Sequence, residues 1–125
     1  MTSGCLAARV FAEWIDDRSE CRFAFDLIVD RVDCRICGQW PIFGATDIGG
    51  PDARPFLLEP DGRLRFGQTD RDWRTDLRGR PIKVGERFQV WWSPTDLAEY
   101  EIVKVAVLGS KAARRGLLGR AGGSG

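Results

Sequence analysis

The chain has 125 residues, of which 43% are apolar and 30% charged, and its formal net charge at pH 7 is +1. This size and balance are typical of one soluble globular domain with a single core. No apolar run approaches the roughly 20 residues of a membrane span. Arg9 interrupts the N-terminal apolar stretch before a signal-peptide core forms, so we expect a cytoplasmic protein that does not enter a membrane.

The absence of histidine limits the chemistry more than any other feature of the composition. It excludes Ser-His and Cys-His catalytic pairs and every metal site that needs an imidazole ligand. Sixteen of the nineteen basic residues are Arg, which favours bidentate pairing with carboxylates.

Residues 6–32 contain two alternating segments joined by a short polar loop and predict a first β-hairpin. A register that pairs Val10 with Phe25 in the core also pairs Arg9 with Asp26 on the outer face. A slip by one residue would destroy both patterns together, so this register is strongly specified.

Cys34 and Cys37 lie in a tight Cys-x-x-Cys-Gly turn, which is the spacing of a zinc knuckle. The remaining ligands cannot be both Cys5 and Cys21, because the first hairpin places them roughly 30 Å apart along its ladder. Zinc at this turn would therefore need Cys5 together with Asp33 or water. One alternative is a redox pair, a motif that usually lies at the start of a helix. The other is two reduced thiols that bind no ligand, and it is favoured because the sequence has no second Cys-x-x-Cys motif.

The next segments predict a short strand and a second hairpin. Residues 40–43 are apolar, and we expect them to form an edge strand or a merely extended segment, because their proline cannot donate to a ladder. Residues 44–54 are expected to form a loop. The Glu-Pro-Asp-Gly turn at 59–62 then predicts a hairpin that pairs Leu58 with Leu64.

Residues 69–78 carry the signals of a short helix. Thr69 and Asp72 have the spacing of a capping box, and Gly79 follows as a helix-ending residue. A polar loop is the alternative, because a segment this short gains little from helix formation alone.

Residues 85–108 predict the third hairpin. Its expected register pairs Phe88 with Ile102 and Val90 with Tyr100, all on the core face. Past Ile102 the apolar phase changes, which predicts either a β-bulge or a strand that is covered on both faces.

Together these elements predict a mainly β fold, a small antiparallel barrel or two-layer sandwich built from three hairpins, with one short helix at most near 69–78. The domain is expected to span 1–108, followed by a flexible basic Gly/Ala/Arg-rich tail at 109–125. Without the four basic residues of the tail, 15 basic and 18 acidic residues remain. This balance differs from the basic footprint of a nucleic-acid-binding domain.

The predicted binding surface centres on Trp91. Trp91 and Trp92 are adjacent, so in a strand they point to opposite faces, with Trp92 in the core. An exposed Trp beside Arg is typical of interface anchors and of base-stacking platforms. If another element covers this face, Trp91 is instead an ordinary core residue. The candidate binding residues are Trp91, Arg87, Gln89, Trp73 and Arg74.

Three functional hypotheses follow. The leading one is a non-catalytic binding module, or a small inhibitor-like regulatory protein, that binds another protein through Arg, Asp and exposed aromatic side chains. The second is a small barrel that binds single-stranded nucleic acid by stacking bases on Trp91 and by contacts from Arg87 and the basic tail. The third is an enzyme that uses Asp and Glu carboxylates or the Cys34 thiol. The sequence contains no phosphate-binding loop or nucleophile elbow, so we expect no enzymatic activity, and no cofactor other than zinc at Cys34 and Cys37.

Overall fold

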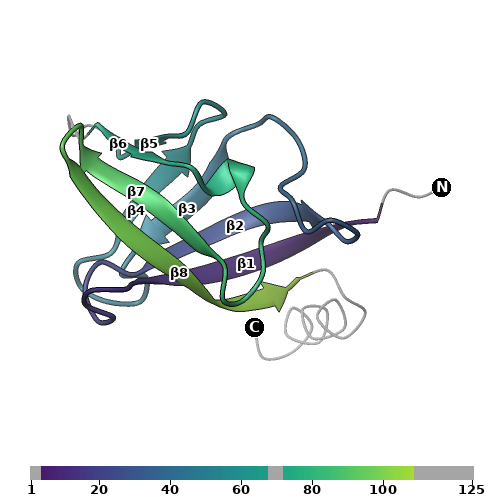
Figure 1. Cartoon of the computed structure of the whole chain (residues 1–125), viewed down its shortest axis with the longest axis horizontal. Helices are drawn as coiled ribbons and strands as arrows, with labels where there is room; N and C mark the ends of the chain where they lie inside the picture. The colour runs from purple at the N-terminus through teal and green to yellow at the C-terminus, as the bar shows by residue number, and fades with distance from the viewer. Residues whose placement is uncertain (1–3, 68–71, 109–125) are drawn as a thin grey trace, which may run out of the picture.

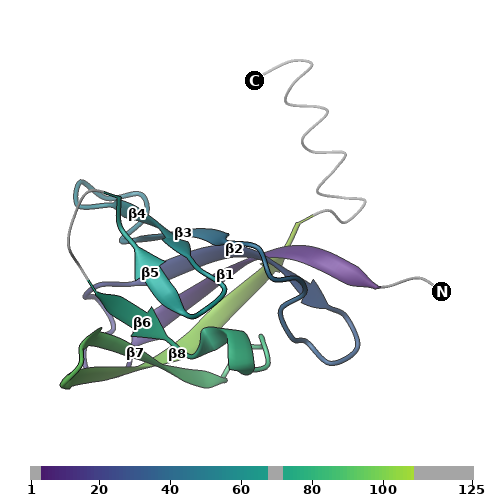
Figure 2. The same ribbon diagram turned by 90° about the horizontal axis from the view of Figure 1, so that it is seen from above.

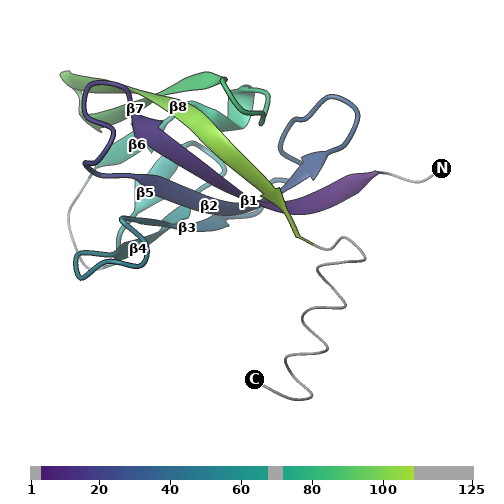
Figure 3. The same ribbon diagram turned by 90° about the horizontal axis from the view of Figure 1, so that it is seen from below.

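The computed structural model describes residues 4–67 and 72–108. Within them, eight antiparallel strands form a closed barrel in which every strand pairs with its neighbours in sequence (Figure 1). The first and last strands run side by side and close the sheet (Figure 3). The strands are β1 (Cys5–Trp14), β2 (Phe23–Asp30), β3 (Ile42–Thr46), β4 (Arg54–Leu58), β5 (Arg63–Arg65), β6 (Trp73–Thr75), β7 (Arg87–Ser93) and β8 (Asp96–Val107). The predicted mainly β fold is confirmed, and of the two architectures the barrel is the correct one.

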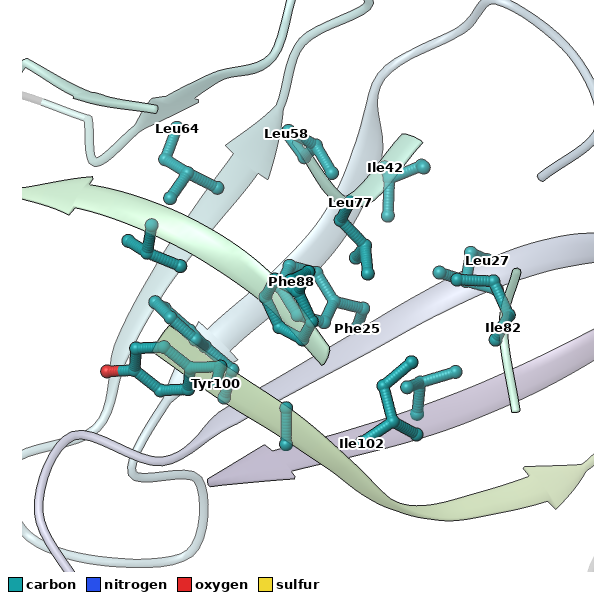
Figure 4. Close-up of a cluster of buried hydrophobic side chains, with 14 of the residues drawn as sticks. Phe25, Leu27, Ile42, Leu58, Leu64, Leu77, Ile82, Phe88, Tyr100 and Ile102 are labelled. Carbon is teal, nitrogen blue, oxygen red and sulfur yellow. The ribbon is translucent and has the colours of Figure 1, made fainter. Parts of the chain in front are cut away.

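Alternate residues of each strand fill the interior of the barrel. In β1, the buried residues Ala8, Val10 and Ala12 are small, and they lie opposite larger residues of β2 such as Phe23 and Phe25. Figure 4 shows the labelled apolar side chains gathered between the strands. Burial of each large apolar side chain contributes roughly 1.5–3 kcal/mol before conformational entropy is counted. The largest fully buried side chains are Tyr100, Phe23, Phe25, Phe88, Leu58, Leu64, Leu77, Ile102, Val10 and Val90.

The first hairpin has the predicted register. Val10 pairs with Phe25, and Arg9 pairs with Asp26 on the outer face. The Arg9 guanidinium donates two hydrogen bonds to the Asp26 carboxylate, from Nε to Oδ1 at 2.6 Å and from Nη2 to Oδ2 at 2.8 Å. This bidentate contact raises the pKa of Arg9. The predicted pairing of Leu58 with Leu64 in the second hairpin is also confirmed.

The third hairpin keeps the predicted faces, but its predicted register is wrong by two residues. Phe88 pairs with Tyr100, and Val90 pairs with Ala98. The cause is a tighter turn, in which Ser93 pairs with Asp96 and only two residues lie between them. The Ser93 hydroxyl accepts the amides of the following turn at 3.1–3.2 Å, which stabilises this short connection.

The prediction for residues 40–54 is wrong in two respects. β3 is not an edge strand, because it pairs with β2 on one side and β4 on the other, and the proline lies before it. The strand also continues to Thr46, inside the predicted loop. Gly44 suggested a loop but is required by packing, since a Cβ there would lie 2.7 Å from the Phe56 ring.

The short helix predicted near 69–78 is wrong for the part that the structure describes. Residues 73–75 form β6, and only the short 3-10 helix η1 (Leu77–Gly79) follows. β6 pairs with β5 and β7, so the ladder that closes the barrel outweighs a weak local helix signal. Residues 68–71 and the predicted tail at 109–125 lie outside the described residues.

The change of apolar phase in β8 marks a β-bulge, one of the two predicted alternatives. Ala12 pairs with Ile102 while its neighbour Phe11 pairs with Lys104, so Val103 is the extra residue. The bulge turns the last part of β8 so that Val105 packs against the core.

One end of the barrel is closed by a contact between two connecting segments. The segment 77–86 lies beside the loop 31–37 (Figure 2), where the Ile82 amide donates to the Cys34 carbonyl at 2.6 Å. Leu77 and Ile82 are buried beneath this contact. Among residues 4–67 and 72–108, no helix has the length and apolar character needed to cross a bilayer.

Tyr100, the only tyrosine of the chain, allows a test of this core through pH. Its ring is buried, and its hydroxyl, which points away from the core cluster in Figure 4, donates to the Cys21 carbonyl at 2.9 Å. Burial is the main reason that the pKa of Tyr100 is raised above 10.0. As the pH rises, the phenol of the unfolded chain therefore loses its proton at a lower pH than the phenol of the folded protein. The stabilising effect of Tyr100 is present below the ordinary pKa and declines as the pH rises above it.

We expect the phenolate absorbance of the wild-type protein to appear only as the protein unfolds at alkaline pH. Tyr100→Phe should remove the part of the alkaline destabilisation that comes from this group. At neutral pH the same variant should lower the free energy of unfolding by about 1 kcal/mol through the lost hydrogen bond. Absorbance of a phenolate in the folded protein at its ordinary pKa would contradict the buried position of Tyr100.

Candidate functional site

Two of the predicted binding residues, Trp91 and Arg74, lie opposite each other on neighbouring strands. Arg74 of β6 pairs with Trp91 of β7. Trp91 is half-buried, and Arg74 is exposed. Both side chains line a surface pocket of about 420 Å³, whose other lining residues are Asp61, Asp72, Thr75, Ser93 and Pro94. We call this site the Trp91 pocket.

Hydrogen bonds that join Thr75 of β6 and the following residue Asp76 to β7 hold the Trp91 pocket in place. The Thr75 hydroxyl donates to the Gln89 carbonyl at 2.8 Å, and the Gln89 amide donates to Asp76 Oδ1 at 2.8 Å. The other carboxylate oxygen, Asp76 Oδ2, accepts from Arg80 Nη2 at 2.7 Å, and this contact raises the pKa of Arg80. Gln89 therefore contributes through its backbone, two residues before Trp91.

The charges of the Trp91 pocket lie at its rim. The Asp61 carboxylate accepts the Arg63 amide at 3.0 Å, and this hydrogen bond is the main reason that the pKa of Asp61 is lowered. Arg74 Nε lies 4.0 Å from Asp72 Oδ1, a long contact between two exposed groups. Exposed ion pairs of this kind are weak, so Arg74 is available to a carboxylate of a ligand.

Arg87 and Gln89 share the outer face of β7 with Trp91, as predicted from the alternation, but they do not line its pocket. They lie opposite two acidic residues of β8, with Arg87 paired with Glu101 and Gln89 paired with Glu99. Glu101 also accepts a hydrogen bond from Arg18 Nη2 at 2.9 Å. This part of the face therefore carries both signs of charge.

Trp73 is separated from the other four predicted residues. It pairs with Leu64, and its ring lies 5.0 Å from the Phe66 ring and 6.0 Å from the Trp92 ring, measured between centroids. Trp92 in turn lies 4.8 Å from Trp14. Trp73 thus belongs to an aromatic group that packs against the core, whereas its neighbour Arg74 faces outward. Trp92 is half-buried in the same group rather than fully buried.

The two cysteines of the Cys-x-x-Cys turn have different surroundings. Cys37 Sγ lies 2.7 Å from Cys5 Sγ, and the donor atoms of Cys5, Asp30 and Cys37 all lie within 4.8 Å of one another. Cys34 is not a member of this group. It has a positive φ of 62°, and its amide donates to the Asp30 carbonyl, so its backbone helps to form the turn. The hydrogen bond with Cys5 is the main cause that raises the pKa of the Cys37 thiol to about 11.

The structure also shows an apolar surface that the sequence argument missed. Phe43 of β3 and Leu57 of β4 pair on the outer face of the barrel, and they are 51% and 42% exposed. Together with Pro55 and Arg65 they line a shallow depression of about 580 Å³. The available signal was the run Phe56-Leu57-Leu58, because three consecutive apolar residues in one strand cannot all face the core.

These features define an eight-stranded antiparallel barrel with a filled interior and its recesses on the outer surface. No protein-family model, curated protein or solved structure matches this chain. Function is therefore inferred from the geometry of the chain itself.

Proposed function

We propose that this protein is a non-catalytic binding module that engages another protein through the Trp91 pocket. The observation that carries the proposal is the pairing of a half-buried Trp with an exposed Arg in one recess on the outside of the barrel. Trp and Arg are enriched among the residues that dominate the energy of protein interfaces. The interior of the barrel is filled by its own side chains, so binding falls to the outer surface.

The lining of the pocket indicates which part of a partner it would accept. The Trp91 and Pro94 rings offer an apolar contact, and the rim carries one positive charge, on Arg74, and two negative charges, on Asp61 and Asp72. A partner segment with an apolar or aromatic side chain, flanked by charged residues, matches this pattern. Its carboxylate would bind Arg74 in a bidentate manner and so replace the long contact with Asp72.

The acidic residues near Trp91 count against nucleic acid as the ligand. Asp61 and Asp72 line the pocket, and Glu99 and Glu101 lie opposite the next outward residues of β7. These carboxylates would repel a phosphate backbone, whose affinity for proteins comes largely from Lys and Arg contacts.

Neither the Cys37 thiol nor the carboxylates of the Trp91 pocket favour an enzyme. A nucleophilic cysteine needs a lowered pKa, whereas the pKa of Cys37 is raised. The two carboxylates of the Trp91 pocket are both exposed, so they lack the contrasting environments that separate a catalytic acid from a base.

The proposal is tested by affinity capture from lysate of the source cells, with and without nuclease treatment and with the full chain as bait. We expect the wild-type chain to retain a specific protein, and Trp91→Ala and Arg74→Ala each to reduce its retention. A hot-spot residue worth about 2 kcal/mol corresponds to a loss of about 30-fold in affinity. The control is Trp40→Ala, which removes a half-exposed Trp that does not line the pocket and should retain the partner fully.

Equal retention by the wild type and both pocket variants, with the folding of each variant verified by denaturation, would contradict the proposal. Retention that disappears on nuclease treatment would point to nucleic acid instead. Titration with single-stranded oligonucleotides at low salt examines this alternative directly, because base stacking on Trp91 would quench its fluorescence and weaken as salt is added.

A further inference from the structure

A second site is formed on the outer face of the barrel by residues from three separate segments. Cys5, the first residue of β1, pairs directly with Asp30, the last residue of β2. Residues directly opposite each other in an antiparallel pair project to the same side of the sheet. The hydrogen bond from the Arg31 amide to the Gly4 carbonyl, at 2.7 Å, continues the pairing past these two residues.

The Cys-x-x-Cys turn brings the third residue to this face. After the turn, Ile36 forms a β-bridge with Val29, and the Cys37 amide donates to the Ile28 carbonyl at 2.8 Å. This segment therefore lies along the edge of β2 that faces away from β1. Ile36 packs against the core, and Cys37, its neighbour, lies on the outer face near Cys5.

We propose that Cys5, Cys37 and Asp30 bind a thiophilic divalent cation of the zinc class. Two thiolates and one carboxylate are ligand types that zinc takes in proteins, and three protein ligands leave a fourth tetrahedral position for water. Their donor atoms already lie within 4.8 Å of one another. The proposal replaces the pair Cys34 and Cys37 that the sequence spacing suggested.

Little movement is needed to form the site. With Zn–S bonds of about 2.3 Å, two sulfurs on one tetrahedral zinc lie about 3.8 Å apart. The sulfurs of Cys5 and Cys37 are 2.7 Å apart, so they must separate by about 1 Å. Cys5 is an exposed residue at the start of its strand.

The carboxylate of the site is held by the chain around it. Asp30 Oδ1 accepts the amides of Val32 at 2.8 Å and Asp33 at 3.2 Å. Hydrogen bonds of this kind fix the orientation of a metal-binding carboxylate.

The test is titration of the reduced full-length chain with Co²⁺, followed by displacement with Zn²⁺ in competition with a chelator of known affinity. We expect one Co²⁺ per chain, with the sulfur-to-cobalt charge-transfer absorption of thiolate ligands. Loss of a residue that only orients a metal ligand typically weakens binding by about 10–100-fold. Because Cys5, Cys37 and Asp30 are direct ligands, Cys5→Ser and Cys37→Ser should each weaken binding by more than about 100-fold, and Asp30→Asn by at least about 10-fold. Cys34→Ser is the matched control, because it alters the same Cys-x-x-Cys motif and should leave the affinity unchanged.

Two results would overturn the proposal. Loss of Co²⁺ binding in Cys34→Ser would show that Cys34 is a ligand, as the spacing of the Cys-x-x-Cys motif suggested. No binding by the reduced wild-type chain, whether or not oxidation then joins Cys5 to Cys37 in a disulfide, would show that the two thiols do not hold a metal. Neither result bears on the Trp91 pocket, which shares no residue with this site.

Discussion

Phe25→Ala is expected to lower the free energy of unfolding by about 3–5 kcal/mol, the usual cost of replacing a buried Phe by Ala. Phe25 is completely buried, and its ring centroid lies 5.5 Å from that of Phe56 and 6.2 Å from that of Phe88. These residues come from β2, β4 and β7, so the cavity would remove contacts across the whole interior. The measurement is urea denaturation at neutral pH, in which the midpoint should fall while the slope stays constant.

The matched control is Phe43→Ala on the adjacent strand. Phe43 is half-exposed on the outer face and pairs with Asp26, the residue after Phe25. Its removal should change the free energy of unfolding by no more than about 0.5 kcal/mol. Equal effects of the two variants would contradict the assignment of Phe25 to the inside and Phe43 to the outside. If Phe25→Ala does not fold, Phe25→Leu should still fold, with a smaller loss of stability than that of the alanine variant.

Gly44→Ala should destabilise the protein although it adds only one methyl group. The new Cβ would lie 2.6 Å from the Ala24 carbonyl oxygen and 2.7 Å from the Phe56 ring. The first of these contacts is with backbone, so β2 and β3 must move apart. Overpacking of this kind costs about 1–3 kcal/mol, which thermal and urea denaturation both detect.

Gly79→Ala provides the comparison for this variant. A Cβ at Gly79 meets no atom within 4 Å, and the change should cost no more than about 0.5 kcal/mol. Wild-type stability in Gly44→Ala would be inconsistent with the close approach of β2, β3 and Phe56 described above.

The first and third hairpins show what an alternating pattern can and cannot specify. In the first hairpin, the pairing of Arg9 with Asp26 supported the apolar pattern, and the predicted register is correct. In the third, the predicted and observed registers differ by two residues and place the same side chains on the same faces. A pattern of period two cannot distinguish them. The turn at Ser93 selects the observed register, through hydrogen bonds that the alternating pattern does not reveal.

The strand β6 was missed and β3 was predicted to end too early, because ladders with neighbouring strands define both of these short strands. β6 has only three residues, and β3 contains Gly44 and Ala45, which have little intrinsic strand propensity. Their strand conformation follows from ladders with neighbours on both sides, which depend on the closure of the whole barrel.

The same reasoning explains the candidate sites. The outward position of Trp91 followed from alternation alone. Trp73 and Arg74 were predicted together, but adjacent residues of a strand face opposite sides, so β6 separates them. The pairing of Cys5 with Asp30 followed from the first hairpin, whereas the approach of Cys37 depends on the path of the turn between β2 and β3, which the motif spacing does not specify.

The closure of the barrel by β1 and β8 has a consequence for the order in which the protein is made. The pairing of Ala8 with Val107 joins the first strand of the barrel to its last, so the sheet stays open until β8 has been synthesised. Until then, β1 exposes one unpaired edge, which is a surface for aggregation. Such long-range pairing also slows folding. A chain that stops before β8 should therefore associate with other copies or bind chaperones instead of remaining a soluble monomer.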